Sequence, residues 1–396
     1  MKINRLSIKY HPTGIEIEEV EFDQTLSLLV GISGVGKTTI LTAIQNLKSV
    51  VNGASINGFE WDIELSNDNN KYHWKGAFEF GEDSLDLIEL SRAFNFGSEK
   101  KIPEYKIKSE FLIINDNEVI SREDDSIIFN GQKTVKLAPT KSAINLLKEE
   151  DDILIIFNNF MKITTIDNND YSKNTFSLIN PDFYRYLEDN LDLNKIRSVK
   201  NDIQSKLYLC QEIVPEAFND FISIFKQIFP YVEDLKVETL NLGGKLEEYS
   251  QLIIKIKEHG VDHWVSQNSI STGMMKTLIH LAYVFLSPKG TIFLVDEFEN
   301  GFGVNCINSI SDRVLNAGLD YQFIVTSHHP YIINKIPVEK WKIVNRERNV
   351  IKTYKAKNYI DNSNHDSFIK LINSNFYMNG IYNLNNDDDW TEEDFE

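Results

Sequence analysis

The chain opens with apolar and polar residues in alternation, a pattern that predicts strands. LSIKY (residues 6–10) and GIEIEEVEF (14–22) repeat every two residues, as expected for strands buried on one face. TLSLLV (25–30) is a nearly continuous apolar run, which predicts a strand buried on both faces. In TILTAIQNLK (39–48) the apolar residues recur at the spacing of one helical face. The start of the chain therefore predicts strands, a short loop and a helix.

The next segments change from a strand-like to a helical pattern. From about residue 58 to residue 137 the two-residue period continues, in runs such as FEWDIEL and YHWKGAFEF, and Asn130-Gly131 predicts a tight hairpin. From residue 141 to 261 the pattern is mainly helical, in SAINLLKEEDDILIIFNNFM, PDFYRYLEDNL and IRSVKNDIQSKLYLCQEIV, with one predicted strand in QLIIKIKE. The helix in VPEAFNDFISIFKQIF carries an apolar stripe that we interpret as core, formed by Phe218, Phe221, Phe225 and Ile228.

Helical and strand patterns alternate after residue 270. STGMMKTLIHLAYVFL predicts a helix, TIFLVDE a buried strand, NCINSISDRVLNAG an amphipathic helix, YQFIVTS another buried strand and YIINKI a short helix. Such alternation is typical of parallel α/β sheets, and WKIVNRERNVIKTYKA predicts a terminal hairpin. We predict a discontinuous head formed by residues 1–140 and 262–360, with a β lobe at about 58–137, a mainly helical lobe at 141–261 and a C-terminal extension at 361–396.

Composition narrows the class of protein. The net charge is −18 and the excess of acid extends well beyond the acidic C-terminus, which excludes a strongly cationic surface for nucleic acid but leaves room for a local basic groove. Two cysteines, Cys210 and Cys306, favour a reducing compartment over a disulfide framework or a zinc site. A signal peptide and an apolar run of about 20 residues are both missing. We predict a cytoplasmic protein without membrane contact.

The tail NNDDDWTEEDFE is unusual, because seven of its last ten residues are acidic and Trp390 and Phe395 stand among them. We interpret it as a disordered, solubilising end. A docking peptide for a basic partner, or a mimic of nucleic acid, is the alternative. The three acids at 387–389 do not make a metal site without a fold around them.

The loop GISGVGKTT, between a predicted strand and a predicted helix, matches the phosphate-binding pattern G-x-x-x-x-G-K-[ST] in full. In such a loop successive backbone N–H groups and the start of the following helix face the phosphate oxygens. Lys37 would reach the β- and γ-phosphates, and the hydroxyl of Thr38 would bind Mg²⁺. The predicted nucleotide-binding residues of the loop are Gly31, Ser33, Gly34, Val35, Gly36, Lys37, Thr38 and Thr39.

The strand TIFLVDE ends in two carboxylates that suit ATP chemistry. Asp296 is a candidate Mg²⁺ ligand together with Thr38. Glu297 is a candidate general base for an attacking water. Apolar strands also end in acids at a sheet edge for structural reasons, and for this pair taken alone that interpretation stays open.

Two further motifs place polar groups at the ends of predicted elements. In STGMMK, Ser271 begins a helix and Gly273 allows close backbone approach, which suits an anion; an ordinary serine N-cap is the alternative. In TSHHP, His328 and His329 directly follow a buried strand. A polar contact to a γ-phosphate is preferred over a metal site there, because cysteines and further histidines are missing nearby.

The order of these motifs resembles that of the ABC-like ATPase heads of the RecF, structural-maintenance-of-chromosomes and overcoming-lysogenization-defect group. STGMMK stands where that group has its signature motif, VDEFENG where it has Walker B, and IVTSHHPYII where it has the switch histidine. The resemblance covers residues 1–50 and 265–345 by specific motifs. It implies an α/β fold, namely an ABC-type P-loop NTPase head with an antiparallel β lobe and a helical insertion.

The resemblance also implies the roles of the site residues. Residues 31–39 would hold ATP, and Asp296 would hold Mg²⁺ with Thr38. Glu297 would polarise the attacking water, and His328 would sense or stabilise the γ-phosphate. The implied activity is hydrolysis of ATP to ADP and phosphate, slow and regulatory.

Other positions bear on how such heads pair. Ser271 and Gly273, with Lys276, would close on the ATP of a facing subunit, so the chain is expected to form a head-to-head dimer or a higher homo-oligomer. Gly303 stands where transporter-type heads carry an aspartate, so transport is not expected. Gln132, in the β lobe, is our candidate for the Q-loop glutamine that such heads carry.

Three cellular roles fit a head of this type. The first is antiviral defence, because the chain resembles the ATPase subunits of the PARIS, Septu and retron-associated systems, which work beside a separate effector such as a nuclease. The second is DNA repair or chromosome maintenance, as in RecF-like and SMC-like heads. The third is a scaffold in which ATP only locks oligomers together, against which Glu297 argues. The first is our prediction and the second its main alternative.

Overall fold

The computed structural model describes residues 1–67, 70–81, 103–166, 177–188, 191–243, 249–299 and 320–358. The chain divides into two compact units. Unit 1 comprises Met1–Thr165, Gly290–Asp296 and Leu319–Glu396, and unit 2 comprises Ile166–Lys289 and Glu297–Gly318. The predicted helix NCINSISDRVLNAG, which contains Cys306, lies outside the described residues. Gly303 and the C-terminal extension with its acidic tail lie outside them as well.

Unit 1 is built around one large sheet. Its strands are β1 (Lys2–Tyr10), β2 (Ile15–Glu21), β3 (Leu26–Val30), β4 (Phe59–Ser66), β5 (Lys71–Phe78), β6 (Ile107–Ile114), β7 (Asn117–Glu123), β8 (Ser126–Phe129), β9 (Gln132–Lys133), β10 (Ile163–Ile166), β15 (Ile292–Val295), β16 (Gln322–Thr326), β17 (Trp341–Glu347) and β18 (Val350–Lys355). Its helices are α1 (Lys37–Val51), α3 (Ala143–Leu146), α4 (Asp151–Met161) and α11 (Pro330–Lys335), with 3₁₀ turns at Val338–Lys340 and Ala356–Asn358.

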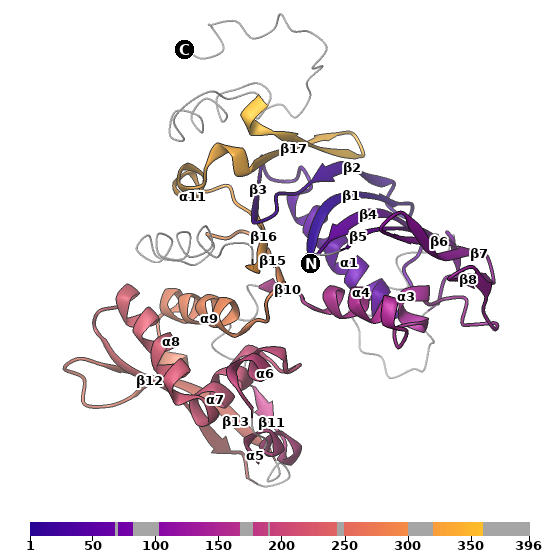
Figure 1. Cartoon of the computed structure of the whole chain (residues 1–396). Coiled ribbons are helices and arrows are strands. Elements are labelled where there is room, and N and C mark those ends of the chain that lie inside the picture. Colours follow the sequence, from indigo (N-terminus) through magenta and orange to yellow (C-terminus); the bar gives the residue numbers. More distant parts are fainter. Residues whose placement is uncertain are drawn as a thin grey trace, which may run out of the picture. The chain divides into compact units, whose positions relative to one another are not determined.

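The sheet joins a parallel core to an antiparallel lobe (Figure 1). Fourteen strands of the described residues follow the order β10-β15-β16-β3-β17-β18-β2-β1-β4-β5-β6-β7-β8-β9. Strands β15, β16, β3 and β17 run parallel, whereas neighbours from β2 to β9 are antiparallel. This arrangement confirms the predicted α/β class with its antiparallel β lobe.

The C-terminal hairpin lies in the middle of this sheet. Strand β17 pairs in parallel with β3, where Ile343 lies opposite Val30, and β18 pairs in parallel with β2. The hairpin therefore connects the strand before the phosphate-binding loop to the β lobe. Its sequence pattern predicts a hairpin but not these neighbours, because they lie near the opposite end of the chain.

One apolar core fixes helix α1 against the β lobe. Ile40, Ile44 and Leu47 of α1 are fully buried and share a core cluster with Ile63 and Trp74 of the lobe strands. Helices α1 and α4 lie along the same side of the lobe in Figure 1. Burying an apolar side chain of this size contributes about 1.5–3 kcal/mol. The helix that begins at the phosphate-binding loop is therefore firmly held along its length.

Unit 2 combines a small antiparallel sheet with helices. Its strands are β11 (Leu178–Ile179), β12 (Val232–Asn241), β13 (Ser250–Glu258) and β14 (Val265–Ser266), in the order β11-β13-β12 with β14 beside β13. Its helices are α5 (Arg185–Glu188), α6 (Leu193–Ser198), α7 (Ile203–Ile213), α8 (Pro215–Ile228) and α9 (Thr272–Leu286), with 3₁₀ turns at Pro181–Tyr184 and Gln267–Ser269. Helices α7 and α8 contact both β12 and α9.

The apolar stripe predicted on α8 is core, because all four of its side chains are buried. Two features of this region differ from what the sequence pattern indicates. The sequence pattern does not predict β12, since an irregularity between Val232 and Asp234 shifts its register and breaks the two-residue period. The helical pattern of IRSVKNDIQSKLYLCQEIV falls into two helices, α6 and α7, because the Asp202 carboxylate accepts a hydrogen bond from the backbone N–H of Ser205 (3.0 Å) and starts a new helix.

The functional domain boundaries stay a prediction, and the compact units divide the chain at other points. Helices α3 and α4, which the sequence assigns to the helical lobe at 141–261, pack in unit 1, where Ile144, Ile153 and Phe160 join its core. Helix α9, which the sequence assigns to the head, packs in unit 2. In the described part of the chain, no helix combines the length and apolar character needed to cross a membrane.

Lys206 contacts the C-terminal end of α9. Its Nζ donates hydrogen bonds to the carbonyl oxygens of Arg197 (2.7 Å) and Leu286 (3.4 Å), and positive charge is favourable at a helix C-terminus. Burial lowers the pKa of the Lys206 ammonium from 10.5 to about 8. The ammonium group therefore loses its proton at a lower pH in the folded chain than in the unfolded chain.

We expect Lys206 to make the free energy of unfolding rise with pH between about pH 8 and 10.5. In that window the folded chain has released this proton while the unfolded chain still binds it, and stability rises with pH wherever the unfolded state binds more protons. Lys206→Met should remove this rise. Urea midpoints of the wild type and the variant are measured from about pH 7.5 to about pH 10. The wild-type midpoint should rise relative to that of the variant as the pH increases. A constant difference between the two midpoints would contradict the assignment.

Candidate nucleotide-binding site

The phosphate-binding loop runs from the end of β3 to the start of α1. Gly34 and Gly36 have φ angles of 84° and 104°, which only glycine adopts readily. A Cβ at Gly36 would overlap the side chain of Ile351 in β18, and one at Gly31 would lie 2.6 Å from the carbonyl oxygen of Val344 in β17. The C-terminal hairpin thus packs directly on the loop and requires glycine at both positions.

The start of α1 suits an anion. Its N-cap is Gly36, which has no side chain to accept a hydrogen bond, and its first turn carries no acidic residue. The helix has 15 residues, and the N–H groups and dipole at such an end favour negative charge. Ser33 and Gly34 are exposed, Thr39 is half-buried, and Val35 is buried so that it could offer only its backbone N–H.

Lys37 lies folded over this loop. Its Nζ donates hydrogen bonds to the carbonyl oxygens of Gly31 (2.7 Å) and Ile32 (2.9 Å). These bonds fix the ammonium group inside the loop, where the lysine of a P-loop meets the β- and γ-phosphates. The loop backbone and the ammonium together form a cradle of positive charge.

Asp296 connects this loop to the strand β15. The hydroxyl of Thr38 donates to its Oδ2 (2.8 Å), and the hydroxyl of Thr326 donates to its Oδ1 (2.6 Å). Oxygen-bearing side chains from α1, from the end of β15 and from the end of β16 therefore converge in unit 1. The sequence analysis missed Thr326, although a polar residue at the end of the buried run QFIVT is a signal that could have found it.

The convergence follows from the direction of the strands. Strands β15, β16 and β3 are parallel, so their C-terminal ends lie along one edge of the sheet, which is where open α/β sheets bind ligands. Asp296, Thr326 and Gly31 stand at or just beyond these ends. His328, two residues beyond β16, is exposed.

The oxygens around Asp296 fit Mg²⁺. This ion usually binds one or two carboxylates together with substrate phosphates, rather than a complete cage of protein ligands. Within the described ranges, no group of three or more His, Cys, Asp or Glu side chains could hold a metal ion by itself. Asp296 and the hydroxyl of Thr38 offer the partial ligand set that a bound nucleotide would complete.

Glu297 has a left-handed backbone conformation. Its φ is 47° and its side chain is exposed. A non-glycine residue held in this region costs about 1–3 kcal/mol, and such strain gathers at functional sites. The conformation supports a functional interpretation of this carboxylate over that of a surface acid at a strand end.

The remaining predicted residues lie in unit 2, at the start of α9. Ser271 is the N-cap, and its Oγ accepts a hydrogen bond from the backbone N–H of Met274 (3.2 Å). Ser271 therefore makes the ordinary serine N-cap contact. A role of this residue toward phosphate stays a proposal. Ser271 is exposed and Gly273 half-buried, whereas Lys276 in the next turn is only 6% exposed.

Unit 1 thus brings together Lys37, Thr38 and Asp296, while the candidate residues at 271–276 and Glu297 belong to unit 2. Gln132, the candidate for the Q-loop, is exposed in β9, the strand at one edge of the large sheet.

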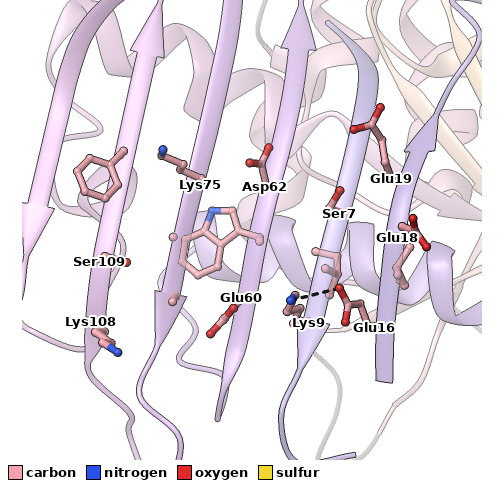
Figure 2. Close-up of a pocket in the computed structure, with 16 residues that line it drawn as sticks. Ser7, Lys9, Glu16, Glu18, Glu19, Glu60, Asp62, Lys75, Lys108 and Ser109 are labelled. Carbon is pink, nitrogen blue, oxygen red and sulfur yellow. Dashed lines mark ion pairs between the residues drawn. The ribbon is translucent and has the colours of Figure 1, made fainter. Parts of the chain in front are cut away.

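A separate hollow of about 700 Å³ opens on the β lobe. Figure 2 shows basic and acidic side chains across it, among them Lys75, Asp62, Glu60, Lys9 and Glu16, with Lys9 and Glu16 forming an ion pair (3.2 Å). None of the predicted site residues lines this hollow. Opposite charges on neighbouring strands are a usual means of stabilising a solvated sheet face, so we assign no ligand to it.

The chain is similar to several known proteins. A family model described as "AAA domain, putative AbiEii toxin, Type IV TA system" matches residues 26–334, a span that includes every predicted site residue. The chromosome partition protein Smc of Methanocaldococcus jannaschii is 25% identical over 156 residues, which cover 37% of the present chain and 13% of that protein. The chain thus matches only a small part of the length of this relative.

Solved structures similar to this chain include heads of SMC proteins. An Smc head bound to the C-winged helix domain of ScpA has a TM-score of 0.46 and 16% identity, with 89% of the present chain and 98% of that chain covered. The SMC head domain from Thermotoga maritima has a TM-score of 0.42 and 14% identity, with 90% and 99% covered.

Proposed function

The chain belongs to the AAA-domain family whose model matches residues 26–334, and from this premise we propose that it is a slow, regulatory ATPase. Paired ABC-type heads bind ATP with Mg²⁺, hydrolyse it to ADP and phosphate, and thereby control a separate effector protein. The observation that carries the proposal is the contact of Thr38 and Thr326 with Asp296, which links the phosphate-binding loop to the carboxylate that suits Mg²⁺.

Each site residue has a role in this proposal. The backbone N–H groups of residues 31–39 and the lysine ammonium bind the phosphates, and fixed donors of this kind stabilise the charge that develops during phosphoryl transfer. Thr38 and Asp296 hold Mg²⁺, which when bound neutralises phosphate charge. Glu297 accepts a proton from the attacking water, and His328 contacts the γ-phosphate.

Pairing of heads is the second part of the proposal. Ser271 and Gly273 face the ATP of the other subunit, and the exposed start of the 15-residue helix α9 supports this, because a helix N-terminus favours an anion. Neither subunit then has a complete site by itself. ATP acts chiefly as a switch on assembly, and its hydrolysis reverses that switch.

Mixing two inactive variants tests the pairing directly. Ser271→Arg keeps its own phosphate-binding loop but blocks the neighbour's nucleotide, and Lys37→Ala has the opposite defect. In a mixture, about half of randomly paired dimers combine the two variants, and each has one intact site of two. Phosphate release should therefore recover to roughly a quarter of the wild-type rate if heads form symmetric dimers.

The matched control is Lys37→Ala mixed with the double variant Lys37→Ala/Ser271→Arg, in which every composite site is defective. That mixture should stay inactive. Loss of the N-cap costs only about 1 kcal/mol, so Ser271→Arg should remain folded, which its thermal midpoint checks. If the first mixture is as inactive as the control, sites do not form between subunits.

We propose antiphage defence in the cytoplasm as the cellular role, with a nuclease as one suitable effector. The family description, which names a toxin–antitoxin system, supports a chain that acts together with a second protein. The similarity to a chromosome partition protein favours the alternative, DNA repair or chromosome maintenance. Infection assays on cells with the chain and its neighbouring genes discriminate the two, because only defence predicts protection that Lys37→Ala removes.

A further inference from the structure

Lys276 differs from the other polar residues of its motif in being buried. It lies in the second turn of α9 with 6% of its surface exposed, although Ser271 and Thr272 at the start of the helix are exposed. A buried ammonium group is costly unless an opposite charge or hydrogen bonds compensate for the lost water. The residue is therefore poorly placed to reach a nucleotide on another subunit and needs a partner in its own chain.

Glu297 supplies a negative charge that acts on Lys276. Burial lowers the pKa of Lys276, and the negative charge of Glu297 opposes this lowering. His280, one turn further along α9, adds no competing charge, because burial lowers its pKa to about 3 and keeps the ring neutral. Its Nδ1 lies 3.1 Å from the carbonyl oxygen of Lys276 and donates to it in the matching tautomer.

An aromatic contact fixes the backbone that carries Glu297. Phe298 is 3% exposed, and its ring meets that of His280 edge to face at a centroid distance of 6.3 Å. Lys276 and His280 are four residues apart and so share one face of α9. Anchoring Phe298 beside His280 holds the preceding residue close to Lys276, all within unit 2.

The conformation of Glu297 suggests why its carboxylate needs a positively charged neighbour. Its φ of 47° places the carboxylate on a strained turn, with an exposed side chain. An exposed glutamate samples several rotamers, whereas a general base must keep within hydrogen-bond distance of one water. A positive charge fixed in a buried helical turn would restrict the carboxylate to one orientation.

We propose that Lys276 is a positioning residue that holds the carboxylate of Glu297 in the same chain, and that it is not a ligand for the phosphates of a facing subunit. The inference rests on the proposed function, because it requires Glu297 to be the general base. It separates Lys276 from Ser271 and Gly273, with which the sequence groups it. The start of α9 serves the partner's nucleotide, and its second turn serves the chain's own base.

The test is a double-mutant cycle with Lys276→Met and Glu297→Gln, read by single-turnover hydrolysis and by ATP affinity. Lys276→Met keeps length and helix propensity but removes the charge. It should lower the hydrolysis rate on the order of 10²-fold, the effect of misplacing a catalytic group by about 1 Å, with ATP affinity unchanged. In the Glu297→Gln background it should have no further effect on the residual rate, because the group it positions is already gone.

Lys206→Met is the matched control, since it removes a partly buried lysine of α7 that contacts the opposite, C-terminal end of α9. It should leave the hydrolysis rate unchanged. The inference is overturned if Lys276→Met hydrolyses ATP at the wild-type rate, or if it lowers ATP affinity or the residual rate of Glu297→Gln, as a phosphate ligand would. If Glu297→Gln alone has no effect on hydrolysis, the proposed function fails instead, so the two failures are distinguishable.

Discussion

Replacing Glu297 with glutamine is expected to stop ATP hydrolysis while ATP stays bound. The amide keeps the size of the carboxylate but cannot take a proton from the attacking water, and loss of a general base lowers a rate by about 10²- to 10⁴-fold. Affinity should be unchanged, because the phosphates are bound by the loop and by Lys37. Phosphate release at saturating ATP measures the first effect, and equilibrium binding of a fluorescent ATP analogue measures the second.

The same variant should also prolong pairing of the heads, since hydrolysis is what ends it. Light scattering after gel filtration with ATP should show a larger share of dimer or higher oligomer than for the wild type. Glu339→Gln, which changes an exposed carboxylate in the turn at Val338–Lys340, is the matched control and should hydrolyse ATP normally. Undiminished phosphate release from Glu297→Gln would remove this residue from the role of base.

Replacing Lys37 with alanine should abolish ATP binding at ordinary concentrations. The ammonium supplies charge-assisted hydrogen bonds to phosphate, each contributing about 1.5–3 kcal/mol, and it also ties the carbonyl oxygens of Gly31 and Ile32 together. Losing both the phosphate contacts and the loop's own bonds should weaken affinity by about 100-fold or more, as 1.4 kcal/mol corresponds to tenfold. Calorimetric titration with ATP and Mg²⁺ measures this loss.

A second lysine of the same helix provides the control. Lys48 donates a hydrogen bond to the carbonyl oxygen of Ile163 (2.6 Å), at the other end of α1 from the loop. Lys48→Ala should lower the thermal midpoint and retain ATP binding. Lys37→Ala should lose ATP binding and keep a thermal midpoint closer to that of the wild type. An affinity of Lys37→Ala equal to that of the wild type would mean that the loop is not a nucleotide site.

Features predicted from the sequence are those that short segments determine. The buried run before Gly31, the glycines of the loop and the apolar face of α1 are all local, and together they predict the strand, the turn and the helix that form. Asp296 could be placed for a similar reason, because the end of a buried strand in an α/β fold lies at the ligand-binding edge. Its contact with Thr38 joins two such local predictions.

What the sequence leaves open depends on contacts between distant segments or on irregular backbone. Nothing near Trp341 indicates that its strand pairs with β3, and nothing near Gly36 indicates that Ile351 lies against it. The burial of Lys276 is another case, because a lysine in the first turns of a helix is usually exposed. Only the packing of α9 in unit 2 shows that this one faces inward.

The position of the C-terminal hairpin determines when the site can form during synthesis. Strand β3 leaves the ribosome early, but its two neighbours in the sheet, β16 and β17, are translated near the end of the chain. At about 5–20 residues per second, the edges of this fully buried strand stay unpaired for roughly 15–60 seconds until their partners are translated. A nascent or truncated chain that ends before residue 341 therefore lacks both strands of the hairpin that packs against the loop glycines. If the loop binds ATP as proposed, its nucleotide site forms only after the hairpin of β17 and β18 has been translated.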